Sequence, residues 1–378
     1  MKQQTLIALI CAGIIAVLGG WYFGTRTTPA ERESVASGRL MFPDLTPKLK
    51  DATKIEVIHQ GKPMVIALED GRWGVVDKGG YPVQEGKLRG MLTGLTELRL
   101  VEPRTSDPAQ FNRLGVEDPD AKDSNSNRLR VLDAADKPIV DVIVGHRRVR
   151  TQGNVPEQVY VRRPGENQAW LAEGSLQVDS DPQLWLDRDI MNIEHGSIAK
   201  VEATHAGQTL VFSREGDKLA LTQPTEHPKL DDYKVEDVAR ALELLSFQDV
   251  RPAAAAPGEP AGRSVFHTTS GLAITATVFH ADKDLWARFG VADEGATRAD
   301  NATANNAKAG NAKAGNANDG AGKLSARLSG WDYQLGSWKE KSLVPSMDDL
   351  KAPEKTSEPV PDAAAPAAGM PASPGAAK

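Results

Sequence analysis

The chain has 378 residues, of which 40% are hydrophobic and 25% charged, and its formal net charge is −6. This length allows two domains of ordinary size, and the composition is that of a folded globular protein. The mild negative charge and the lack of a basic face argue against binding of nucleic acid. The single cysteine, Cys11, excludes an intrachain disulfide and a cysteine metal cluster.

A continuous apolar run extends from residue 6 to residue 23 and ends in three aromatic residues. Eighteen helical residues span about 27 Å, which matches the hydrocarbon core of a bilayer, and aromatic residues are typical of its interface. We therefore expect residues 1–24 to form a single-pass membrane anchor that contacts the bilayer through residues 6–23. A cleaved signal peptide is the alternative, but Val17-Leu18-Gly19 is a poor cleavage site. Basic residues stand on both sides of the run, so charge alone leaves its orientation open.

Prolines at positions 29, 43 and 47 interrupt any helix that could follow this anchor. Residues 25–50 are therefore predicted to be a linker next to the membrane.

Two parts of the chain have similar sequences. Residues 53–57 resemble residues 199–203, and a histidine and a glycine follow each segment at the same spacing: His59 and Gly61, and His205 and Gly207. Alternating apolar residues between tight turns predict antiparallel strand meanders after both segments. Apolar residues at helical spacing predict one amphipathic helix in each copy, with Leu88, Leu92 and Leu95 in the first and Val238, Leu242 and Leu245 in the second.

The order of these elements predicts an α+β fold of two related repeats after the anchor, repeat one at 51–195 and repeat two at 196–345. Residues 298–323 repeat Asn-Ala-Lys-Ala-Gly, and residues 346–378 are rich in Pro and Ala. Such segments bury too little apolar surface to offset the entropy lost on ordering. We expect a disordered insertion at about 298–323 inside repeat two, and a disordered tail at 346–378.

A succession of short motifs extends over roughly residues 50 to 290. It includes Ile55-Glu56-Val57, Trp73, Tyr81-Pro82-Val83, Val101-Glu102-Pro103, Leu114-Gly115-Val116, and Trp185 before Asp187-Arg188-Asp189. This succession resembles the DUF4340 domain, a family of unknown function. The second copy departs from the pattern, since it lacks a counterpart of Leu114-Gly115-Val116. The resemblance implies an N-terminal membrane helix, a place in the cell envelope with the bulk outside the cytoplasm, and ABC-type transport components as neighbours.

One basic segment is a candidate site. His146, Arg147, Arg148 and Arg150 follow a predicted strand and are expected to form an anion-binding loop, suited to a lipid headgroup or a glycan phosphate. A solvated loop is the competing interpretation.

Other reactive side chains lack the pattern that their chemistry needs. His59 and His205 show no metal-ligand spacing, and neither Ser264 nor Ser270 stands in a nucleophile elbow. Five tryptophans could line a sugar site: Trp73, Trp170, Trp185, Trp286 and Trp338. Most of them fall in apolar strand or helix patterns, so packing in the core is the expectation. We therefore expect no catalytic, cofactor-binding or metal-binding residues, and no enzyme activity.

The sequence thus predicts a membrane-anchored accessory or interaction protein of the cell envelope. Its expected location is the inner membrane with the soluble part in the periplasm, and its expected partner is an ABC-type transporter or another membrane protein complex. The first alternative is an envelope solute- or glycan-binding protein that uses a cleft between the repeats. The second, less favoured alternative is a hydrolase.

Overall fold

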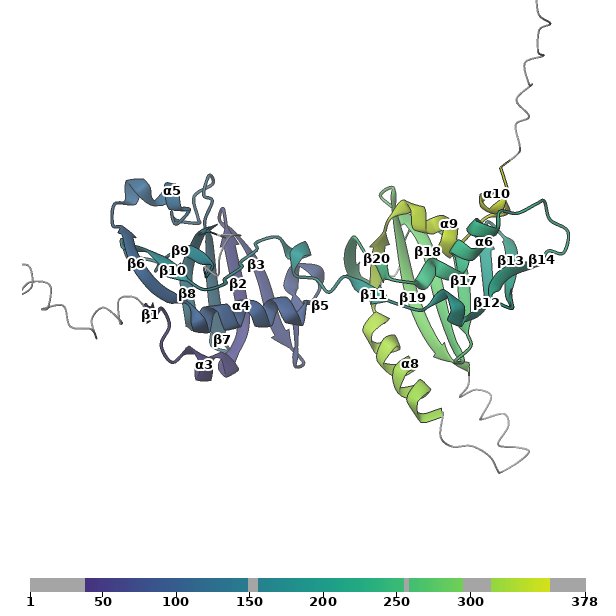
Figure 1. The fold of residues 1–378 in the computed structure, drawn as a ribbon, viewed down its shortest axis with the longest axis horizontal. Helices are drawn as coiled ribbons and strands as arrows, with labels where there is room; N and C mark the ends of the chain where they lie inside the picture. Colours follow the sequence, from purple (N-terminus) through teal and green to yellow (C-terminus); the bar gives the residue numbers. More distant parts are fainter. Residues whose placement is uncertain (1–37, 149–155, 255–257, 295–313, 354–378) are drawn as a thin grey trace, which may run out of the picture.

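The computed structural model describes residues 38–148, 156–254, 258–294 and 314–353. Two antiparallel sheets lie side by side along the long axis of the molecule, with few helices beside them (Figure 1). The fold is therefore α+β and rich in sheet, as predicted. No helix in these four ranges is long and apolar enough to cross a bilayer, and the predicted span at 6–23 lies outside the described residues.

The first sheet has ten strands in the order β1-β6-β10-β9-β8-β7-β2-β3-β4-β5. The strands are β1 Arg39–Leu40, β2 Ala52–His59, β3 Lys62–Glu69, β4 Arg72–Val75, β5 Tyr81–Pro82, β6 Arg99–Thr105, β7 Asn127–Asp133, β8 Pro138–Arg148, β9 Gln158–Arg162 and β10 Ala169–Glu173. Three α-helices belong to this unit: α3 Leu45–Lys48, α4 Glu85–Glu97 and α5 Phe111–Leu114.

Helix α4 lies across one face of the first sheet (Figure 1). It begins after Pro82, with Glu85 in its first turn, where a carboxylate favours the positive end of the helix dipole. Leu88, Met91 and Leu95 recur at helical spacing and are buried against the alternating apolar residues of the strands. This packing orients α4 and determines which of its side chains remain on the surface.

The second sheet has eight strands in the order β14-β13-β12-β17-β18-β19-β20-β16. The strands are β12 Ile198–His205, β13 Gln208–Glu215, β14 Lys218–Gln223, β16 Asp249–Pro252, β17 Glu259–Thr268, β18 Leu272–Ala281, β19 Asp284–Asp293 and β20 Trp331–Leu335. The α-helices described beside them are α6 Asp232–Ala239, α8 Ala314–Leu328, α9 Glu340–Leu343 and α10 Met347–Leu350. Two short strands, β11 Asp189–Met191 and β15 Leu245–Ser246, pair with each other between the two sheets.

Eight strands follow the same spatial order in both sheets. The order β4-β3-β2-β7-β8-β9-β10-β6 in the first corresponds to β14-β13-β12-β17-β18-β19-β20-β16 in the second. The first hairpin of each unit also turns over two residues with positive φ, Gln60-Gly61 and Ala206-Gly207. The first sheet differs by the short strands β1 and β5 at its edges.

Several predicted boundaries differ from the observed ones. Residues 38–50 of the expected linker fold onto the first unit, because Met41 and Leu45 are buried in its core. The helix predicted through Leu245 ends earlier: α6 stops at Ala239, and Leu245 lies in strand β15.

The two segments expected to be disordered also differ. Residues 314–323 form the first part of α8, and Leu324 and Leu328 farther along this helix pack into the core. The expected tail begins with α10, where Leu350 is buried and Ser346 forms a capping box with Asp349. The remaining parts, 298–313 and 354–378, lie outside the described residues.

The junction between the two sheets is packed with aromatic side chains. Tyr81 of the first unit meets Phe247 and Trp331 of the second edge-on, with ring centroids 5.2 Å and 5.0 Å apart. An ion pair between Lys78 Nζ and Asp249 Oδ1, at 2.7 Å, links the same two units. Such contacts join the two sheets into one continuous core.

Asp249 receives several hydrogen bonds at this junction. Lys78 donates to both carboxylate oxygens, Gln183 Nε2 donates at 2.8 Å, and the Val250 amide donates at 2.7 Å. Burial acts to raise the pKa of Asp249, but these donors together outweigh it and hold the pKa below its ordinary value.

Candidate functional site: a groove beside helix α4

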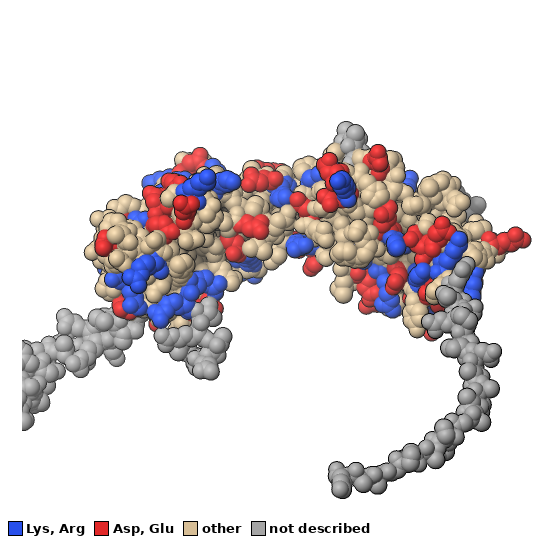
Figure 2. Space-filling view, turned by 90° about the horizontal axis from the view of Figure 1, so that it is seen from above, with Lys and Arg blue, Asp and Glu red and all other residues tan. Residues whose placement is uncertain are grey.

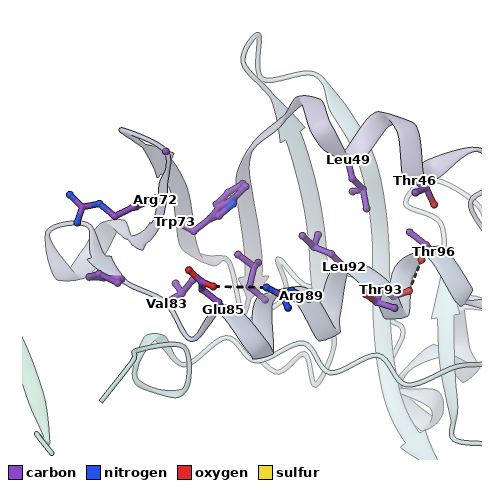
Figure 3. Close-up of a pocket in the computed structure, with 13 residues that line it drawn as sticks. Thr46, Leu49, Arg72, Trp73, Val83, Glu85, Arg89, Leu92, Thr93 and Thr96 are labelled. Carbon is purple, nitrogen blue, oxygen red and sulfur yellow. Dashed lines mark hydrogen bonds and ion pairs between the residues drawn. The ribbon is translucent and has the colours of Figure 1, made fainter. Parts of the chain in front are cut away.

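An open groove runs along α4 on the first unit and has a volume of about 490 Å³ (Figure 3). Three parts of the chain form it. They are helix α4, the strand β4 together with Pro82 and Val83 just before α4, and the segment with Thr46 and Leu49 that precedes β2. The lining residues are Thr46, Leu49, Gly71, Arg72, Trp73, Pro82, Val83, Glu85, Leu88, Arg89, Leu92, Thr93 and Thr96.

The floor of the groove is apolar. Trp73 from β4, Leu92 from α4 and Leu49 from the short 3-10 helix Leu49–Asp51 project into it from three sides (Figure 3). All three are half-buried and pack on the main core, so their exposed parts form a pre-ordered apolar surface. Leu92 stands one turn after buried Leu88, at the margin of the apolar stripe of α4.

The rim of the groove is polar. Glu85 and Arg89 lie one helical turn apart with 4.0 Å between their charged atoms, and their side chains are 89% and 78% exposed. Such a pair contributes little to stability, so both groups are available to a ligand. Thr96 Oγ1 donates to the Thr93 carbonyl at 2.7 Å, whereas Arg72 points away from the floor (Figure 3). The groove thus suits an apolar side chain flanked by polar or charged groups.

The lining offers little for catalysis. Glu85 is its one carboxylate, and no histidine, cysteine or serine lines the groove as the structure describes it. General acid–base or nucleophilic chemistry needs such groups in contact with each other. The arrangement therefore favours binding over reaction.

The predicted anion-binding residues lie at the end of strand β8 and point to different neighbours. His146 packs against Gly115, where an added Cβ would lie 2.9 Å from the histidine Cδ2 atom. Arg147 pairs with Glu157 at 2.8 Å, and Arg148 is opposite Gln158 on β9. Arg150 lies outside the described residues. The prediction of a loop is thus wrong for His146, Arg147 and Arg148, which belong to the strand.

Glu157 forms an ion pair with this basic segment. The hydrogen bond from Arg147, assisted by one from Ser175, lowers the pKa of Glu157. Glu157 is therefore ionised at neutral pH and neutralises Arg147, which leaves Arg148 as the described arginine of the segment without a carboxylate partner.

The expectation that the tryptophans pack in the core does not predict the groove. Trp185 is fully buried, but Trp73 is half-buried in the groove and Trp338 is 67% exposed. A signal was present in α4: its apolar stripe includes Leu92 beside Met91, which makes it wider than one packed face requires.

Comparisons with known proteins give one match. A family model described as "Domain of unknown function (DUF4340)" matches residues 73–262, half of the chain. The matched segment begins at Trp73 and includes α4, the junction and the first strands of the second sheet. A search of curated proteins and a search of solved structures found no match. The chain therefore belongs to the DUF4340 family.

Proposed function

We propose that this chain is a membrane-anchored accessory protein of the cell envelope, without a catalytic centre of its own. It holds a membrane partner through the α4 groove. An ABC-type transport system or another membrane protein complex is the proposed partner, and the soluble part is proposed to lie in the periplasm.

The observation that carries this proposal is the apolar floor of the groove. Trp73 and Leu92 are held by the core yet remain in part accessible. Aromatic side chains fixed in this way are typical anchors of protein interfaces, and a rim of exposed charges keeps the surface soluble without a partner. Glu85 and Arg89 supply such a rim.

The anchor explains how a modest groove can be effective. An apolar helix at residues 6–23 would confine the protein to the membrane, and residues 24–37 would tether the first unit to it. A tether raises the effective concentration of the groove toward a partner in the same membrane without adding any contact.

The proposal includes two related repeats. It is supported by the shared order of eight strands and by the equivalent first hairpins of the two units. The groove belongs to the first repeat, which has the additional strand β5 and a helix, α4, that is longer than α6 of the second repeat.

The alternative of a solute- or glycan-binding protein has less support. That reading needs a cleft between the repeats, but Tyr81, Phe247 and Trp331 fill the junction, and Lys78 pairs with Asp249 beside them.

The test is affinity purification of the full-length protein from membranes in mild detergent. We compare wild type with Leu92→Asp, which places a charge on the groove floor, and with Val76→Asp. Val76 is 45% exposed and lies outside the groove, so it is a matched apolar-to-acid control. We expect the wild type and Val76→Asp to retain the same membrane protein, and Leu92→Asp to lose it by tenfold or more.

Thermal unfolding of the three proteins shows whether each is folded. Equal recovery of the partner by wild type and a folded Leu92→Asp would contradict the role of the groove. Complete extraction of the wild type from membranes by alkaline carbonate would contradict the anchor.

A further inference from the structure

Three arginines lie at the end of the first unit where the described chain begins: Arg39, Arg99 and Arg148. Arg39 lies on β1 opposite Leu100 of β6, and Arg99 lies opposite Leu40. The row that contains Arg99 continues through Glu173 and Gln158 to Arg148 on β8. The three residues therefore span two adjacent rows across five neighbouring strands, a width of about 19 Å. Adjacent rows point to opposite faces of a sheet, so Arg99 and Arg148 share one face and Arg39 lies on the other.

Among the residues that the structure describes, no ion pair neutralises these three side chains. The fourth arginine of the rows, Arg147, is paired with Glu157. Glu173 in the same row binds Gln158 at 3.4 Å, and no ion pair joins it to Arg99 or Arg148 in the structure as described. Arg39 and Arg99 are exposed, and Arg39 stacks on Trp170 with 5.3 Å between the guanidinium carbon and the ring centroid. This cluster, Arg39, Arg99 and Arg148, is positive in a chain whose net charge is −6.

The cluster lies close to the point where the predicted membrane anchor would join the first unit. The described chain begins at the end of the first unit that is remote from the second unit (Figure 1). Lys and Arg side chains gather at that end (Figure 2). If residues 6–23 cross the bilayer, residues 24–37 can hold residue 38 at most about 50 Å from it. Arg39 and Arg99 lie within two residues of that point in the sheet register.

We propose that this end of the first unit rests on the phosphates of anionic lipid headgroups when the chain is anchored. The inference rests on the proposed anchor and deepens it, because it orients the molecule: the first unit lies at the membrane and the second points away. Arginine suits this contact, since its planar guanidinium donates two hydrogen bonds to one phosphate.

The contact should be electrostatic. Each basic residue near an anionic surface changes partitioning by about fivefold, so removal of three shifts the ratio of docked to undocked protein by about two orders of magnitude. The attraction decays within about 8 Å at physiological salt, so added salt should weaken it.

The experiment uses the full-length protein, in a Cys11→Ser background, inserted into vesicles. A fluorophore at Ser175→Cys reports proximity to the membrane, because Ser175 hydrogen-bonds Glu157 beside the cluster. The same fluorophore at Tyr233→Cys, an 86% exposed position on the second unit, is the distant control. Energy transfer to a rhodamine-labelled lipid is compared in phosphatidylcholine with and without phosphatidylglycerol.

We expect transfer from position 175 to rise with phosphatidylglycerol and to fall with added salt, while transfer from position 233 stays low. Arg39→Gln, Arg99→Gln and Arg148→Gln together should abolish the rise. Lys218→Gln, Lys229→Gln and Lys283→Gln, three exposed lysines of the second unit with the same total change of charge, should leave it intact.

Transfer that does not depend on phosphatidylglycerol, or that falls equally in both triple variants, would overturn the inference while leaving the anchor in place. Displacement by inorganic phosphate at constant ionic strength would also overturn it, since a free anion would then be the ligand. Failure of the wild type to insert into neutral vesicles would contradict the anchor itself.

Discussion

At the residue scale, three glycines of α4 have different surroundings. Gly86, Gly90 and Gly94 recur every four residues on one side of the helix. An added Cβ at Gly86 or Gly90 would meet nothing within 4 Å, but at Gly94 it would lie 2.2 Å from the Ser175 carbonyl oxygen. Gly94 is therefore required by the approach of the chain after β10, while the other two are not required by packing.

Substitution of these glycines by alanine should have opposite effects. Gly94→Ala must displace a backbone carbonyl, and we expect it to lower the free energy of unfolding by about 1–3 kcal/mol. Gly90→Ala improves helix propensity in open space and should raise that free energy by up to about 1 kcal/mol. Urea unfolding of the full-length protein in mild detergent measures both, and equal effects would show that the close contact is not as described.

At the element scale, α8 shows where sequence reasoning fails. Residues 298–323 lack large apolar side chains, so composition alone predicted disorder. The apolar residues that fix the helix come late, since Leu324 and Leu328 pack into the core and Arg327 donates to the Ile190 carbonyl. Helix α8 also packs along β19. The helix propensity of the early turns is weak, and tertiary packing of the last turns stabilises the helix despite it.

Truncation of the buried leucine tests this account of α8. Leu328 is 1% exposed, so Leu328→Ala should lower the free energy of unfolding by about 2–4 kcal/mol. Lys323→Ala changes an exposed position of the same helix and should stay within about 0.5 kcal/mol of wild type. A loss from Leu328→Ala as small as that from Lys323→Ala would mean that α8 does not contribute to the core.

Other elements could be predicted because their signals are local. The strand pattern around Ile55 and Val57, the tight turn near Gly61 and the helical spacing of Leu88 and Leu95 each depend on neighbours in sequence. The groove and the arginine cluster could not be predicted in this way. Trp73 and Leu92 line one groove only once α4 has packed on the sheet, and Arg99 and Arg148 share a row only once strands distant in sequence have paired.

At the scale of the whole molecule, the junction couples the two units. Its core is continuous, and Asp249 of the second unit binds Lys78 and Gln183 of the first. We expect a single cooperative unfolding transition rather than separate transitions for the two sheets.

The pH dependence of stability reports on this coupling. The pKa of Asp249 is lower in the folded than in the unfolded chain. Its contribution to the free energy of unfolding is therefore present above about pH 4 and is lost as pH falls through the lowered value.

Asp249→Asn should lower the free energy of unfolding by about 1–2 kcal/mol at neutral pH, because it leaves Lys78, 21% exposed, without its partner. Between pH 5 and about pH 3 the variant should lose less stability than wild type. Asp70→Asn, at an exposed turn, is the control and should keep the wild-type slope, and a wild-type slope in Asp249→Asn would contradict the assignment.

We propose that the α4 groove receives a partner in the membrane. Photo-cross-linking in cells tests it most directly, with benzoylphenylalanine placed at Thr93 on the groove rim or at Tyr233 on the second unit. Both positions are exposed, so neither change should disturb packing. We expect the probe at Thr93 to form a cross-link to an integral membrane protein, Leu92→Asp to abolish this product, and the probe at Tyr233 not to form it. No cross-link from Thr93 above the level at Tyr233, in cells where the full-length protein is anchored, would contradict the account.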